Sequence, residues 1–113
     1  VREVLGRADA AAEITAALGR RQLWFGANGR PDRGEGSMVA AFKKDAMIDV
    51  SSKLMDLTAP DGLLERGVEG ALEHGAVEFG YRLAAANAIY GGTAEILKSI
   101  VAQAALGLPR SRG

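Results

Sequence analysis

Apolar residues recur every three or four positions in four separate runs of the chain, the spacing that places them on one side of an α-helix. These runs predict helices over residues 2–25, 38–57, 71–90 and 93–106. The apolar positions expected to be buried are, run by run, Val4, Ala8, Ala11, Leu18 and Phe25; Val39, Phe42, Ala46, Val50, Leu54 and Leu57; Leu72, Ala76, Phe79, Leu83, Ala86 and Tyr90; and Ile96, Ile100, Val101 and Ala104. Four helices with short connections predict an all-α fold, an antiparallel four-helix bundle forming one domain over residues 1–113.

Residues that favour turns and helix ends separate the four runs. Glycine and proline are frequent in residues 26–36, which we expect to form a loop, and Ser37 is expected to cap the second helix. Residues 58–62 are expected to turn around Pro60, and residues 63–70 to form a short helical turn and loop. The polar side of the second helix carries Lys43, Lys44, Asp49 and Lys53.

The composition excludes several classes of function. The chain has 14 basic and 14 acidic residues and 5% aromatic residues, which argues against binding to nucleic acid. No apolar run reaches the roughly 18 residues of a membrane span, and because no basic and apolar leader pattern is seen at the first residues, we expect no secretory signal. Cysteine is absent and His74 is the single histidine, so we expect neither a disulfide nor a metal site, and we expect a cytoplasmic location.

The most distinctive stretch covers residues 90–96 and reads YGGTAEI. Its two adjacent glycines permit a positive φ or the close approach of a ligand. Thr93 and Glu95 follow at the start of the last helix, where a hydroxyl can cap the helix and a carboxylate suits its dipole. Such a helix start can bind an anion, but a plain corner between two helices needs the same residues, so spacing alone leaves both interpretations open.

The residue identities in this stretch indicate a protein family more specifically than the spacing of its residues does. Residues 89–110, IYGGTAEILKSIVAQAALGLPR, resemble the C-terminal signature of acyl-CoA dehydrogenases, I-Y-G/E-G-T-x-E/Q-I followed by a helix that ends in L-G-L-P-R. Residues 37–43, SMVAAFK, resemble the start of the family's second-to-last long helix, and residues 79–83, FGYRL, resemble the segment before the signature. The resemblance covers roughly residues 1–112 and implies the family's C-terminal helical bundle without its first long helix.

The resemblance also implies contacts with FAD in the full-length protein or complex. The implied cofactor-binding residues are Gly91, Gly92, Thr93, Ala94, Glu95 and Gly62. Thr93 is the best single candidate, because its hydroxyl and the backbone N–H groups beside it lie at a helix start. Gly62 matches a glycine-rich turn that touches the flavin of a neighbouring subunit in many members, although Ala59 and Pro60 replace the usual glycine pair here.

A catalytic base is not expected within this chain. In the family a carboxylate removes the α-proton of an acyl-CoA while hydride passes to the flavin. In many members this glutamate directly follows the signature tyrosine, a position occupied here by Gly91, which has no side chain. Other members place the base on the helix that this chain is expected to lack, and Glu95 lies four residues beyond the base position.

Three functions therefore remain open. The first is the C-terminal part of a flavin-dependent acyl-CoA dehydrogenase, inactive alone, which contributes flavin contacts and an oligomer interface. The second is a non-catalytic partner subunit of a heteromeric acyl-CoA dehydrogenase, and the third is a free-standing helical interaction module. The first two imply a homo- or hetero-oligomer of acyl-CoA dehydrogenase subunits with acyl-CoA as the substrate of the full assembly, and no reading involves nucleic acid or a membrane.

Overall fold

The computed structural model describes residues 1–110, which contain four α-helices and two short 3-10 helices. The elements are α1 (Arg2–Ala27), α2 (Glu35–Thr58), η1 (Asp61–Leu63), η2 (Leu72–Gly75), α3 (Ala76–Ile89) and α4 (Ala94–Ala104). No strand occurs in this part of the chain, so the all-α prediction is confirmed. Within the same residues, no helix has both the length and the apolar composition that crossing a membrane requires.

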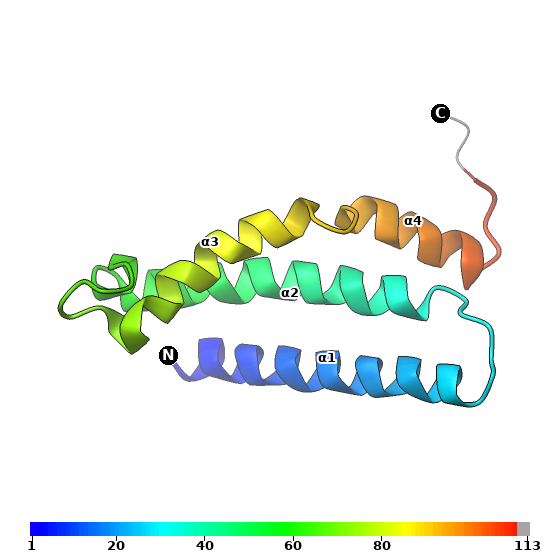
Figure 1. The fold of residues 1–113 in the computed structure, drawn as a ribbon, viewed down its shortest axis with the longest axis horizontal. Helices are drawn as coiled ribbons and strands as arrows, with labels where there is room; N and C mark the ends of the chain where they lie inside the picture. The colour runs from blue at the N-terminus through cyan, green and yellow to red at the C-terminus, as the bar shows by residue number, and fades with distance from the viewer. Residues whose placement is uncertain (111–113) are drawn as a thin grey trace.

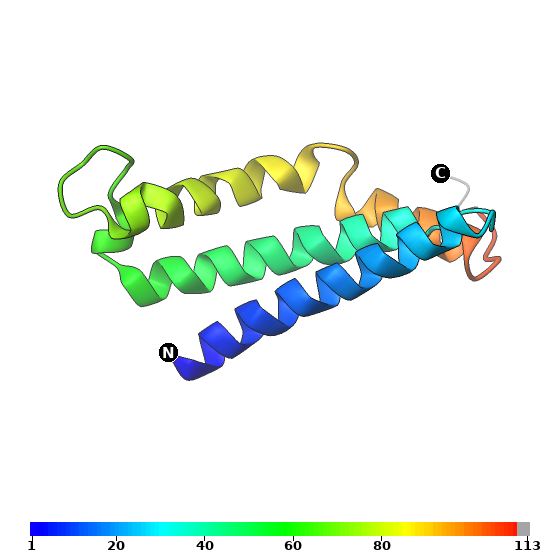
Figure 2. The ribbon, with the colours of Figure 1, turned by 60° about the horizontal axis from the view of Figure 1, so that its bottom comes forward.

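α2 is the central helix of the fold. α1 packs along one side of it, while α3 and α4 follow one another along another side (Figures 1 and 2). All three run antiparallel to α2, as Figure 1 shows. Two consecutive helices, α3 and α4, thus share one position of the antiparallel bundle, and the corner between them lies against the middle of α2.

This arrangement is open, with a small core. The radius of gyration is 17.0 Å, against about 13 Å for a compact domain of this length. The accessible surface is 7992 Å², against about 5,900 Å² for a compact protein of this mass. Among residues 1–110 the buried apolar side chains are Ala41, Met55, Ala84 and Leu97, all in the helices that meet at α2. About 2,000 Å² of extra surface is therefore available for packing against further protein.

In the first two helices, most of the residues predicted to face the core do so. The apolar residues predicted to face inward from α1 are its half-buried positions, and the prediction for α2 holds except at Leu57, which is exposed. The predicted cap of α2 is wrong, because the helix begins at Glu35 and Ser37 lies inside its first turn. Asp32 takes the capping role: its Oδ1 accepts hydrogen bonds from the N–H groups of Gly34 (2.7 Å) and Glu35 (2.8 Å).

The third predicted helix starts later than expected. Glu73 (φ 49°), His74 (φ 57°) and Gly75 (φ 82°) adopt left-handed conformations, which an α-helix cannot contain, so α3 begins only at Ala76. Left-handed backbone is rare for residues other than glycine, and the sequence of Glu73 and His74 gives no sign of it.

The predicted buried faces of α3 and α4 are also wrong. The six apolar residues predicted to be buried on the third helix are all exposed: Leu72, Ala76, Phe79, Leu83, Ala86 and Tyr90. The side of α3 that is buried or half-buried includes the small residues Gly80, Ala84 and Ala88, of which Ala84 is fully buried. α4 likewise buries Leu97 and half-buries Val101, while the other predicted positions, Ile96, Ile100 and Ala104, are exposed.

Candidate functional site

The corner between α3 and α4 has the backbone that its glycines predict. Gly91 (φ 72°) and Gly92 (φ 94°) both have positive φ, and they turn the chain from the end of α3 at Ile89 to the start of α4 at Ala94. A side chain at either glycine would be strained, because L-residues other than glycine rarely adopt this conformation.

Thr93 caps α4, as predicted. Its Oγ1 accepts a hydrogen bond from the N–H group of Ile96 (3.4 Å), and its carbonyl accepts one from Leu97 (3.0 Å). The N–H groups of the first helical residues, Ala94 and Glu95, have no partner within the helix, as at every helix start. Thr93 therefore holds the first turn of α4 in place beside the two glycines.

The space around the two glycines differs. A Cβ atom added to Gly91 would meet no described atom within 4 Å, whereas one added to Gly92 would lie 3.7 Å from the side chain of Leu97. The corner is thus open at Gly91 and backed by the buried Leu97 at Gly92. The Thr93 hydroxyl, the N–H groups and the open glycine are groups of the kind that bind a nucleotide cofactor, although the Glu95 carboxylate already accepts from the Thr93 hydroxyl and the Glu95 N–H group.

Charged side chains surround the start of α4. The pKa of Glu95 is lowered chiefly by a hydrogen bond from its own backbone N–H, then by the Thr93 hydroxyl, with Lys98 also favouring the charged form. Lys98 forms an ion pair with Asp45 of α2 (Nζ to Oδ2, 2.8 Å), which raises the pKa of Lys98. A carboxylate with a lowered pKa is a weak proton acceptor, so Glu95 lacks the property that a general base for this chemistry needs.

Gly62 lies far from this corner. It is buried next to Thr58 and Val77, and a Cβ atom there would lie 2.1 Å from the Thr58 Oγ1 and 3.5 Å from the Val77 Cγ1. Lys44, which contacts the corner, precedes Thr58 by 14 positions on α2, or about 20 Å of helix. The structure brings Gly91, Gly92, Thr93, Ala94 and Glu95 together in this subunit and leaves Gly62 apart, and any cofactor contact of Gly62 stays a prediction.

A contact of Lys44 with the corner was not predicted from the sequence. Lys44, expected on the polar side of the second helix, is half-buried, and its Nζ donates to the backbone carbonyls of Asn87 and Tyr90. Those carbonyls belong to a segment more than 40 positions further along the chain, so no local sequence pattern could have indicated this contact.

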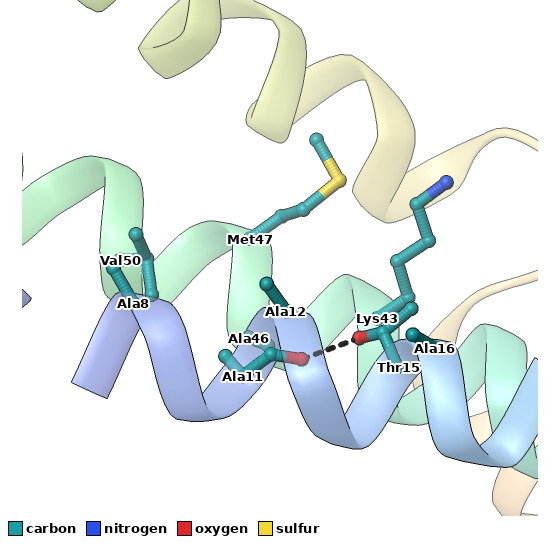
Figure 3. Close-up of a pocket in the computed structure, with 9 residues that line it drawn as sticks. All are labelled: Ala8, Ala11, Ala12, Thr15, Ala16, Lys43, Ala46, Met47 and Val50. Carbon is teal, nitrogen blue, oxygen red and sulfur yellow. Dashed lines mark hydrogen bonds between the residues drawn. The ribbon is translucent and has the colours of Figure 1, made fainter. Parts of the chain in front are cut away.

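A separate groove of about 430 Å³ lies between α1 and α2 (Figure 3). Its lining residues are Ala8, Ala11, Ala12, Thr15, Ala16, Lys43, Ala46, Met47 and Val50. The Thr15 hydroxyl donates to the Ala11 carbonyl (2.7 Å), so its polarity is satisfied within α1. Lys43 is the single charged residue of this lining, so the groove is suited to packing against protein and has no set of groups for catalysis.

The fold and the corner together define a helical domain of the acyl-CoA dehydrogenase type. The family model described as "Acyl-CoA dehydrogenase, C-terminal domain" matches residues 1–106. The chain therefore belongs to the acyl-CoA dehydrogenase family through this domain, as the signature at residues 89–110 indicated.

Two solved structures are similar to the chain over nearly its whole length. One is described as "Tcur3481-Tcur3483 steroid ACAD", with 27% identity and a TM-score of 0.88, covering 97% of this chain and 29% of that chain. The other is the ChsE4-ChsE5 complex from Mycobacterium tuberculosis, with 26% identity and a TM-score of 0.85, covering 97% of this chain and 28% of that chain. This chain thus spans less than a third of either structure's chain, and no curated protein matches it.

Proposed function

We propose that this chain is the C-terminal part of a flavin-dependent acyl-CoA dehydrogenase and contributes flavin contacts and an oligomer interface. The observation that carries the proposal is the corner at Gly91 and Gly92, where two positive-φ glycines lead into a helix capped by Thr93. In the full assembly the reaction is the α,β-dehydrogenation of an acyl-CoA thioester, and FAD supplies the hydride acceptor.

The residues of the corner fit a role in holding FAD. The open space beside Gly91 lets a polar group of the cofactor approach the backbone. The N–H group of Ala94 then supplies a hydrogen bond at the start of α4, and the Thr93 hydroxyl and the Glu95 N–H group supply further ones once the cofactor replaces the Glu95 carboxylate as their acceptor. Gly62 has no side chain and could contribute only backbone groups, and Thr58 and Val77 already fill the space next to its Cα.

These contacts are too few to bind the cofactor alone. A hydrogen bond contributes about 0.5–1.5 kcal/mol, or up to about 3 with a charged partner. Micromolar binding requires about 8 kcal/mol. We therefore expect the isolated chain to be colourless and inactive, and the rest of the subunit or a neighbouring subunit to supply most of the flavin pocket.

A second function, that of a non-catalytic partner subunit, is favoured by two observations. Gly91 occupies the position where many members carry the catalytic glutamate, and the ionised Glu95 is a poor substitute. The two similar structures, Tcur3481-Tcur3483 and ChsE4-ChsE5, also each have two named components. In either function the base that removes the α-proton lies outside residues 1–113, and the similarity to a steroid ACAD suggests a steroid acyl-CoA as one substrate to test.

The test uses the full-length protein that contains this chain, purified alone and together with the acyl-CoA dehydrogenase subunit that assembles with it. We expect bound flavin, visible as a yellow colour, and loss of that colour when acyl-CoA is added without oxygen. Thr93→Val should lower the flavin content with little change in helix content. The matched control is Thr15→Val, because the Thr15 hydroxyl bonds only within α1.

The outcomes separate the two functions and can refute both. Bleaching by the full-length protein alone supports the catalytic subunit, and bleaching that requires the second subunit supports the non-catalytic partner. A Thr93→Val assembly with an unchanged flavin content would show that the corner does not hold the cofactor. An assembly that never binds flavin would leave the third reading, a helical interaction module.

A further inference from the structure

Lys44 connects the middle of α2 to the end of α3. Its half-buried side chain donates from Nζ to the carbonyls of Asn87 and Tyr90. These two carbonyls flank Ile89, the last residue of α3, and the second belongs to the residue directly before Gly91. The ammonium group of Lys44 therefore contacts the corner from the side that faces α2.

The chemistry of a helix end explains why a lysine belongs there. The last carbonyls of a helix have no N–H partner four residues ahead, and the left-handed turn at Gly91 prevents the helix from continuing. An ammonium group has three donors and can satisfy two such carbonyls at once. Its positive charge also suits the negative end of the helix dipole.

The neighbouring residue on α2 holds the other side of the corner. Asp45 pairs with Lys98 of α4 at 2.8 Å, so consecutive residues of α2 contact the helix before the corner and the helix after it. The Asp45–Lys98 pair is exposed, with side-chain exposures of 52% and 60%, and such pairs contribute little stability. Of these two polar connections between α2 and the corner, the half-buried Lys44 is therefore the more important one.

We propose that Lys44 is a positioning residue for the flavin: by binding the Asn87 and Tyr90 carbonyls, it fixes the orientation in which Gly91, Gly92 and Thr93 meet the cofactor. This inference rests on the proposed function of the corner. Lys44 need not touch the flavin, since it acts through the backbone that carries Thr93. Without the ammonium group, the two glycines leave the corner free to sample other conformations.

The experiment measures the dissociation constant of FAD from the full-length assembly after the cofactor has been removed and added back. Lys44→Met removes the ammonium group and keeps an unbranched apolar chain, and we expect affinity to fall about tenfold. Lys44→Arg restores donors and charge and should recover affinity to within about threefold of the original protein. Lys43→Met makes the same chemical change one position earlier, at an exposed lysine that forms no hydrogen bond with residues 1–110, and should change affinity less than about twofold.

A double-mutant cycle with Thr93→Val separates positioning from general stability. If Lys44 acts by orienting Thr93, Lys44→Met should weaken FAD binding less than about threefold in the Thr93→Val background. A merely structural role would instead lower the thermal midpoint and give additive losses in the two backgrounds. That additive result, or an unchanged FAD affinity in a folded Lys44→Met assembly, would overturn the proposal.

The remaining outcomes are also decisive. If Thr93→Val weakens FAD binding and Lys44→Met does not, this inference fails while the proposed function stands. If Thr93→Val has no effect, the cofactor role of the corner fails, and the positioning role falls with it. Should Lys44→Met not assemble, Lys44→Gln, which keeps a neutral donor, replaces it in the same cycle, and failure of both to assemble would assign Lys44 a purely structural role.

Discussion

Gly75 provides a sharp test of the structure between α2 and α3. It has φ 82° and caps α3, and a Cβ atom at this position would lie 2.5 Å from the Arg66 nitrogen and 2.8 Å from the Arg66 Cα. These are backbone atoms, so the clash cannot be relieved by rotating a side chain. Gly75→Ala therefore has to displace either the loop at residues 64–70 or the start of α3.

The expected loss can be worked out from two contributions. A left-handed conformation costs a residue other than glycine about 1–2 kcal/mol, and forcing extra atoms into a filled space adds about 1–3 kcal/mol. We expect Gly75→Ala to lower the free energy of unfolding by about 2–5 kcal/mol. The matched control is Gly80→Ala inside α3, where an added Cβ meets no described atom within 4 Å, and helix propensity should raise stability by about 0.5–1 kcal/mol.

The assay compares urea unfolding of both variants in the full-length protein and amide hydrogen exchange in peptides covering residues 61–80. Gly75→Ala should speed exchange in this segment, and Gly80→Ala should leave it unchanged or slow it. If the two substitutions have equal effects on the unfolding midpoint, or if exchange in residues 61–80 is unaltered by Gly75→Ala, the left-handed turn described here is wrong.

Three further predictions concern the cap of α2, the Arg82–Glu78 ion pair and association. The hydrogen bond from the Gly34 N–H is the chief cause of the lowered pKa of Asp32, so the stability that Asp32 contributes is present above the usual pKa of 3.8 and is lost as pH falls through the lower pKa of the folded state. In urea unfolding near pH 7, Asp32→Ala should lower the free energy of unfolding by about 1 kcal/mol, while Asp32→Asn should keep the cap and weaken the dependence of stability on acid pH. If Asp32→Asn and the original protein lose stability equally with acid, this prediction is wrong. Arg82→Met should destabilise the protein, because the Glu78 carboxylate, whose side chain is only 11% exposed, loses its ion pair, and adding Glu78→Gln should recover part of the loss in the same assay. The isolated chain should self-associate and bind a hydrophobic dye, since it exposes about 2,000 Å² more than a compact protein; a monodisperse monomer in light scattering without dye binding would count against it.

The sequence alone determined the features that depend on residues close together in the chain. Apolar spacing predicted the four helices, and the pair of glycines before Thr93 predicted a left-handed corner followed by a capped helix. A hydrogen bond within a helix spans four residues and a cap spans three, so these features lie within a short window of sequence. The signature that predicted the family also lies in one continuous stretch, residues 89–110.

Features that depend on distant contacts were decided only by the tertiary structure. α3 is apolar on two sides, and the side with small residues packs on α2 because it allows a closer approach, which periodicity cannot decide. Asp32 replaces Ser37 as the cap because the loop before α2 brings its carboxylate to the N–H groups of Gly34 and Glu35. Lys44 belongs to the corner only because α2 and α3 lie antiparallel, which places its ammonium group beside carbonyls more than 40 residues away. Local hydrogen bonding specifies each helix, but the choice of which faces and charges meet depends on packing between segments far apart in the sequence.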